Sequence, residues 1–103
     1  MTSEYFQRVR WIHGSTDDPV VLWAHVVRGW EVRKVDEFAD GSLTWADEDH
    51  ESESTGLGLI PVPLPAEIAE DPQFVVTLVE QSEFETVWNS AREGSGGSWI
   101  GPG

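Results

Sequence analysis

The chain has 103 residues and no cysteine, and its 19 acidic side chains against six lysines and arginines give a net charge of −13. These numbers exclude disulfides, thiolate zinc sites and cysteine nucleophiles, and they disfavour nucleic acid and anionic membranes as partners. We expect a single-domain cytoplasmic protein, because the N-terminal residues lack an apolar signal region and no apolar run is long enough to cross a bilayer.

The first half of the chain has the pattern of an antiparallel β-meander. Four segments rich in aromatic and β-branched residues are bounded by turn residues, and they cover 4–13, 19–27, 30–38 and 42–46. The dipeptides Arg28-Gly29 and Asp40-Gly41 each predict a two-residue hairpin loop. Asp-Gly is the stronger signal, because a type I′ turn needs positive φ at both central residues.

These turns predict a register that brings most tryptophans to one face of the sheet. Side chains alternate between faces with a period of two, so each pairing decides which side chains share a face. The expected pairs are Val9 with Trp23, His25 with Val32 and Asp36 with Trp45. On this register the opposite, half-apolar face carries Arg8, Glu31 and Arg33, either as a small anion-binding cluster or as a weak surface ion pair.

The second half predicts helices and a fifth strand. The segment 59–65 is extended and punctuated by prolines, 66–71 is a short helical turn, and 74–79 is a strand. The clearest helix covers 82–93, with Ser82 and Glu85 matching a capping box and Gly94 at its C-terminal end. Its apolar stripe consists of Phe84, Val87, Trp88 and Ala91. We expect this stripe to pack on the tryptophan-rich face.

These elements predict an α+β fold with a four- or five-stranded, mainly antiparallel sheet and a C-terminal helix on one face. Residues 1–93 form the single domain in this interpretation, and residues 94–103 form a flexible Gly/Ser-rich tail that contains Trp99.

No catalytic or metal-binding constellation is visible in the sequence. His13 and His25 are expected roughly 20 Å apart along the sheet, which is too far for a shared ligand. The acidic segment does not match a calcium loop, because Ser52 stands where that motif requires glycine. No Gly-x-Ser-x-Gly elbow is present either. We therefore expect a non-enzymatic protein without a metal or cofactor.

The densest feature is an acidic loop that follows the fourth strand. Its carboxylates are Asp47, Glu48, Asp49, Glu51 and Glu53. Two interpretations stay open: a solvated loop without a specific role, or a docking site for lysines and arginines of a basic protein. In the second interpretation Trp45, at the start of the loop, serves as an aromatic anchor.

Several motifs along the chain are similar to those of a small bacterial family of unknown function, DUF6881. They include Trp11-Ile12-His13, Asp18-Pro19-Val20-Val21-Leu22, Asp71-Pro72-Gln73-Phe74 and Glu83-Phe84-Glu85. The most specific piece is Trp30-Glu31-Val32-Arg33-Lys34-Val35, and the resemblance covers Tyr5 to Arg92. It implies a single domain and assigns no catalytic residue.

Three functions follow as hypotheses. The first is an acidic protein-binding module, of the immunity or antitoxin type, that holds a basic partner protein. The second is a recognition or carrier domain that presents the tail with Trp99 to another enzyme. The third is a small-molecule or anion binder, or an enzyme, that uses Arg8, Glu31 and Arg33. A homodimer through the half-apolar face stays open.

Overall fold

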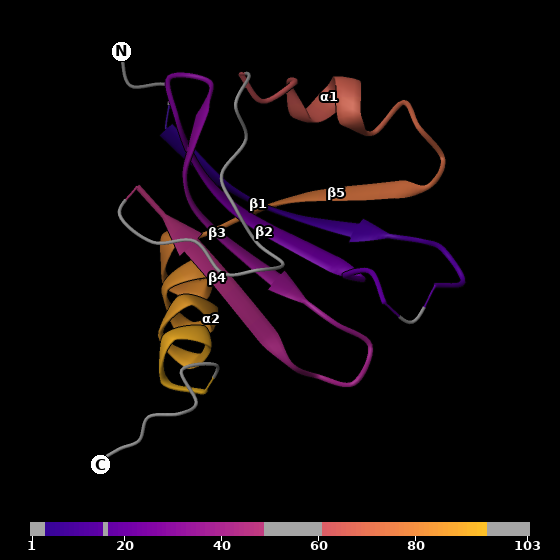
Figure 1. Cartoon of the computed structure of the whole chain (residues 1–103). Helices are drawn as coiled ribbons and strands as arrows, with labels where there is room; N and C mark the ends of the chain where they lie inside the picture. The colour runs from indigo at the N-terminus through magenta and orange to yellow at the C-terminus, as the bar shows by residue number, and fades with distance from the viewer. Residues whose placement is uncertain (1–3, 16, 49–60, 95–103) are drawn as a thin grey trace.

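A computed structural model describes residues 4–15, 17–48 and 61–94, which form one five-stranded antiparallel sheet and two helices (Figure 1). The strands are β1 (Glu4–Trp11), β2 (Val21–Val27), β3 (Trp30–Glu37), β4 (Leu43–Asp47) and β5 (Phe74–Val79). The helices are α1 (Pro65–Ile68) and α2 (Gln81–Gly94). The sheet order is β4-β3-β2-β1-β5. The predicted α+β class and the predicted segments are confirmed.

The β2–β3 hairpin has the predicted two-residue loop. Arg28 and Gly29 both adopt positive φ, at 54° and 84°, and Val27 pairs with Trp30. The β3–β4 hairpin differs from the prediction because its loop has three residues, of which Gly41 adopts a φ of 90°. Phe38 N–H donates to the Ser42 carbonyl at 2.9 Å, and Gly41 N–H donates back to the Phe38 carbonyl at 2.9 Å.

The predicted registers of the β1–β2 and β3–β4 hairpins are wrong by one residue, whereas the predicted β2–β3 register is confirmed next to the turn, where Val27 pairs with Trp30, and fails beyond it. Trp23 pairs with Arg8, and Trp45 pairs with Val35. In the β2–β3 pair, a bulge between His25 and Val26 places His25 opposite Arg33. Because a one-residue slip reverses the faces, β1 presents Phe6 and Arg8, not Val9, beside Trp23.

The face covered by α2 contains the main core. Its buried residues are Phe6, Val35, Phe84, Trp88 and Ala91. The predicted stripe of the helix is confirmed, since Phe84 and Ala91 are fully buried and Val87 packs against the same cluster. The predicted capping box is wrong: α2 begins at Gln81, and the Glu80 carbonyl accepts the first helical hydrogen bonds, from Glu83 and Phe84.

The other face lies under α1 and the segment that precedes it. The backbone N–H of Val62 donates to the carbonyl of Gly29 at 2.6 Å, which ties this segment to the β2–β3 turn. The Glu67 carboxylate accepts the N–H of Leu64 at 3.0 Å and so fixes the start of α1. Figure 1 shows α1 and α2 on opposite sides of the sheet.

Candidate functional site

Arg33 is the centre of a hydrogen-bonded chain on the α2 face. Its terminal nitrogens donate to both carboxylate oxygens of Glu85, at 3.0 and 2.6 Å, and its Nε donates to His25 Nδ1 at 3.0 Å. Because Nδ1 accepts, the proton of the neutral imidazole lies on Nε2, which donates to Glu4 at 2.6 Å. The hydrogen bonds from Arg33 are the main reason that the pKa of Glu85 lies below its ordinary value.

Aromatic rings surround the cations on this face. The guanidinium of Arg33 lies 4.9 Å from the Phe84 ring centre, and that of Arg92 lies 5.3 Å from the Trp45 ring centre. Arg8 lies over Trp23 at 5.7 Å. On the other face, Lys34 Nζ lies 4.0 Å from Asp36. Arg8, Arg33, Lys34 and Arg92, four of the six basic residues, thus each have a ring or a carboxylate of this chain as a neighbour.

The predicted cluster of Arg8, Glu31 and Arg33 does not form. Arg8 and Arg33 lie on the α2 face, whereas Glu31 lines a cavity on the α1 face. In a regular strand, residues two positions apart share a face. The bulge opposite His25 and Val26 makes Val32 an extra residue, and this separates Glu31 from Arg33.

The predicted acidic docking loop is described only at its beginning. Asp47 ends β4, opposite Arg33, and Glu48 follows it at an exposed turn position. Trp45 meets Trp88 edge-on, with ring centres 5.3 Å apart, so its ring packs between sheet and helix and is not a free anchor. The remaining predicted site residues, Asp49, Glu51, Glu53 and Trp99, lie outside the described residues.

The outer edge of β5 is a candidate binding surface, and no described segment pairs with it. Ile12 N–H donates to the Gln73 carbonyl at 2.7 Å, which makes Ile12 and Gln73 a hydrogen-bonded pair. Hydrogen-bonded and non-hydrogen-bonded pairs alternate along an antiparallel ladder. The backbone N–H and C=O groups of Val76 and Leu78 therefore point away from β1.

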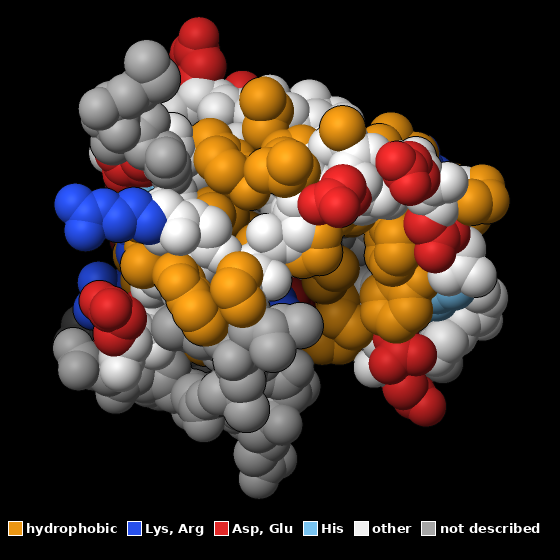
Figure 2. Space-filling view, turned by 90° about the horizontal axis from the view of Figure 1, so that it is seen from above, with side chains coloured by type: hydrophobic (Ala, Val, Ile, Leu, Met, Phe, Trp, Pro, Cys, Tyr) orange, Lys and Arg blue, Asp and Glu red, His pale blue; other side chains and the backbone are white. Residues whose placement is uncertain are grey.

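The side chains of β5 are apolar or neutral, and carboxylates stand at both ends of the strand. Val75 is 49% exposed and Leu78 is 60% exposed. Exposed acidic residues precede and follow the strand; they are Glu67, Glu70, Asp71, Glu80 and Glu83. Figure 2, which looks onto the α1 side, shows hydrophobic side chains at the surface with acidic side chains beside them.

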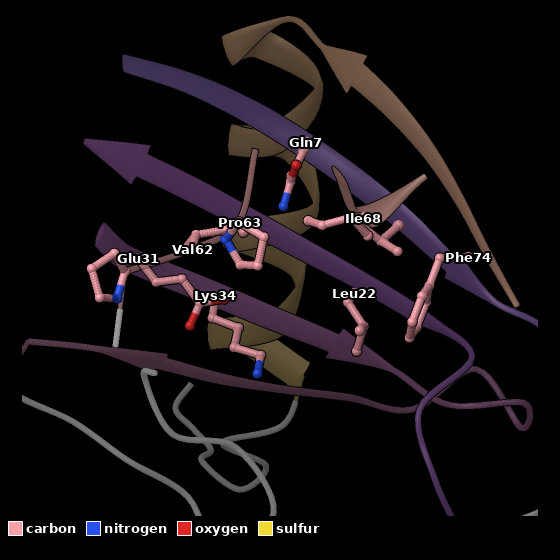
Figure 3. A pocket seen from close by; sticks show the side chains of 11 residues that line it. Gln7, Leu22, Glu31, Lys34, Val62, Pro63, Ile68 and Phe74 are labelled. Carbon is pink, nitrogen blue, oxygen red and sulfur yellow. The ribbon is translucent and has the colours of Figure 1, made fainter. Parts of the chain in front are cut away.

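A cavity of about 370 Å³ lies between the sheet and the segment around α1. Its sheet side is formed by the α1 face of β1 to β3, and its roof by prolines and Ile68 (Figure 3). Gln7, Ala24 and Lys34 occupy one row across the three strands. Gln7 is only 3% exposed, and its Oε1 has no hydrogen-bond partner among the described residues.

The two described histidines, His13 and His25, do not converge in the structure. His13 Nε2 donates to the Pro19 carbonyl at 2.7 Å, and His13 Nδ1 accepts the N–H of Ser15, so this side chain fixes the β1–β2 loop. Within residues 4–15, 17–48 and 61–94, no group of three or more histidines and carboxylates is arranged to hold a metal ion. In the same ranges, neither helix has the length and apolar character needed to cross a membrane.

Comparison with known proteins decides the family. The model of the family described as Domain of unknown function (DUF6881) matches residues 4–93. The chain belongs to the DUF6881 family. No curated protein and no solved structure matches the chain.

The DUF6881 segment contains every feature described above. It begins with β1, includes the cavity beside Gln7 and the edge strand β5, and ends one residue before the end of α2. Trp99 lies outside the matched range. The sequence analysis did not single out Gln7. It predicted that Glu85 belongs to a helix cap, whereas in the structure the Glu85 carboxylate accepts hydrogen bonds from Arg33. No local signal marks either residue, since both roles depend on long-range pairing.

Proposed function

We propose that this chain is an acidic protein-binding module, of the immunity or antitoxin type, that holds an extended basic segment of a partner protein along β5. The observation that carries the proposal is the edge strand itself. Outward-facing backbone groups at Val76 and Leu78 lie beside exposed apolar side chains and between two acidic ends. An edge of this kind is a template for a further strand.

The charge distribution favours a basic partner. The net charge of −13 repels a second copy of the chain, and the exposed acids at both ends of β5 attract lysines and arginines. Backbone hydrogen bonds and apolar contacts along the strand provide affinity, while the flanking charges increase the association rate. The binding therefore weakens as the salt concentration rises.

The experiment is a selection from a displayed library of random peptides against the intact chain. We expect enriched peptides to carry a short core of β-branched or aromatic residues flanked by lysine or arginine. The test variant is Leu78→Pro, because Leu78 N–H points outward and a proline there removes an edge donor while it leaves the β1–β5 ladder intact. Its control is Leu78→Ala, which keeps the donor.

The proposal predicts that Leu78→Pro lowers the affinity for a selected peptide at least tenfold, while Leu78→Ala keeps most of it. Changing Asp71 and Glu80 to Asn and Gln removes most of the salt dependence, whereas the same type of change at Asp40 and Glu48, which flank β4 on the opposite edge of the sheet, does not. No enrichment of basic peptides, or equal binding by Leu78→Pro and Leu78→Ala, would contradict the proposal.

A further inference from the structure

The cavity under α1 has the size and charge balance of a site for a small neutral molecule. Its volume of about 370 Å³ lies at the lower end of the range found for ligand pockets. Among the described residues that line it, Glu31 and Lys34 carry opposite charges, and all the others except Gln7 are apolar. The lining therefore has no net charge, and Gln7 is its one neutral polar side chain.

The side-chain amide of Gln7 presents its nitrogen to the cavity, not its oxygen. Oε1 is fully enclosed and has no hydrogen-bond partner among the described residues. Nε2 likewise has no hydrogen bond to a described residue, but it is not among the fully enclosed atoms. Figure 3 shows Nε2 at the end of the side chain nearest Pro63 and Ile68. A molecule in the cavity therefore meets the N–H donors of this amide and not its acceptor.

These donors are nearly buried and have no side-chain acceptor beside them. Gln7 is 3% exposed, and the side chains of Pro63 and Ile68 contain no acceptor. A donor left unpaired at such a position costs free energy, which a bonded acceptor recovers. A buried water molecule needs two to four polar partners, and the apolar side chains beside Gln7 do not supply them. A carbonyl oxygen on an apolar molecule needs only one donor.

The cavity disfavours charged molecules and molecules with donors of their own. A cation meets the N–H groups of Gln7 and loses its hydration among apolar side chains. An anion is disfavoured by the net charge of −13. An alcohol or an amine brings a donor that finds no acceptor at Gln7, because Oε1 is enclosed. A ketone, an aldehyde or an ester has an acceptor without a donor.

We propose that this cavity binds a small neutral molecule with an apolar body and a carbonyl oxygen that accepts a hydrogen bond from Gln7 Nε2. The apolar body contacts Leu22, Ile68 and Phe74, which line the cavity together with Gln7, and the hydrogen bond fixes its orientation. This site is on the opposite face from the Arg33 network. It uses neither the outer edge of β5 nor a basic partner.

The compounds 1-indanone and indane are a matched pair of probes for this proposal. They share one fused-ring skeleton, but only 1-indanone has a carbonyl group. NMR titrations of the intact chain follow the backbone amides and the side-chain NH₂ group of Gln7. We expect saturable binding of 1-indanone, shifts centred on Gln7, Ala24 and Phe74, and about tenfold weaker binding of indane. The Nε2 protons of Gln7 move downfield with 1-indanone and not with indane. The alcohol 1-indanol binds more weakly than 1-indanone.

The matched protein variant is Gln7→Met, which keeps the side-chain volume and removes the donors. It binds 1-indanone and indane with equal affinity, while the control Gln81→Met, on the exposed start of α2, keeps the preference for 1-indanone. Ile68→Trp fills the cavity from its roof and abolishes binding of both probes, which provides a second test if Gln7→Met does not fold. Absence of saturable 1-indanone binding, an unchanged preference in Gln7→Met, or Nε2 protons of Gln7 that do not move with 1-indanone would overturn the proposal.

Discussion

On the α2 face of the sheet, half-buried polar side chains bond to one another, whereas on the α1 face the buried Oε1 of Gln7 has no hydrogen-bond partner among the described residues. Arg33 bonds to Glu85 and His25, and Trp23 Nε1 donates to Glu37 at 3.2 Å. Across the sheet, a roofed cavity stands beside an unpaired amide oxygen. The difference teaches that the two faces contribute unequally to stability: the main core and the hydrogen-bonded side chains lie on the α2 face, and the binding that we propose does not use that face.

The largest effect is expected in the core of the α2 face. Phe84 is fully buried and contacts Phe6 and Trp88, with ring centres 5.4 and 6.1 Å away. Phe84→Ala should therefore lower the free energy of unfolding by about 3–5 kcal/mol. On the exposed edge, Leu78→Ala should change it by less than about 0.5 kcal/mol. Urea denaturation measures both, and equal effects would contradict the division between the two regions.

A smaller loss is expected when the Arg33 network is broken. Arg33→Met leaves His25 Nδ1 without its donor, leaves Glu85 with only the longer bond from Gln81 Nε2 at 3.5 Å, and removes the cation from the Phe84 ring, and it should cost about 1–2 kcal/mol. Glu85→Gln alone and the double variant complete a cycle that isolates the pair energy. A coupling of zero between Arg33 and Glu85 would show that the bidentate contact does not stabilise the fold.

Substitution of Gln7, unlike that of Arg33, should stabilise the fold. Gln7→Met replaces a buried, unpaired amide by an apolar side chain of similar volume, so it should raise the free energy of unfolding by about 1 kcal/mol. The control Gln81→Met, at an exposed position, should stay within about 0.5 kcal/mol of the original chain. A loss of stability in Gln7→Met would mean that the amide has a partner in the folded chain.

The smallest effect concerns pH. The pKa of Glu85 is lowered in the folded chain, chiefly by the hydrogen bonds from Arg33. A lowered folded pKa stabilises the protein fully above the ordinary value of 4.5, and that contribution disappears as the pH falls through the folded pKa. Because the side chain of Glu85 is 34% exposed, the contribution should be below about 1 kcal/mol. The free energy of unfolding of the original chain and of Glu85→Gln, measured between pH 7 and pH 3, tests this contribution. If the two free energies changed in parallel with pH, the prediction would be contradicted.

The elements of the fold could be predicted from the sequence because their signals are local. The stripe of Phe84, Trp88 and Ala91 repeats with helical spacing, and Arg28-Gly29 adopts the positive φ values that its turn requires. The register could not be predicted, because Asp40-Gly41 fits both a two-residue loop and the observed three-residue loop with positive φ at Gly41. No residue type near Val32 predicts the bulge from the sequence.

The site residues show the same limit. The expected grouping of Arg8, Glu31 and Arg33 depended on regular alternation, and one extra residue in β3 separated them. The partner of Arg33 is 52 residues away in the chain, so its contact depends on how α2 docks onto the sheet. Gln7 is one polar residue within an amphipathic strand, and only the fold shows that it is buried in a cavity.

The most direct test of the proposed binding mode is amide hydrogen exchange of the intact chain with and without a selected basic peptide. The account predicts that the peptide slows exchange at Val76 and Leu78, whose N–H groups point outward, and leaves Thr77, which already bonds to β1, nearly unchanged. Protection confined to other parts of the chain, with Val76 and Leu78 still exchanging as in the free protein, would contradict the claim that β5 accepts a strand from the partner.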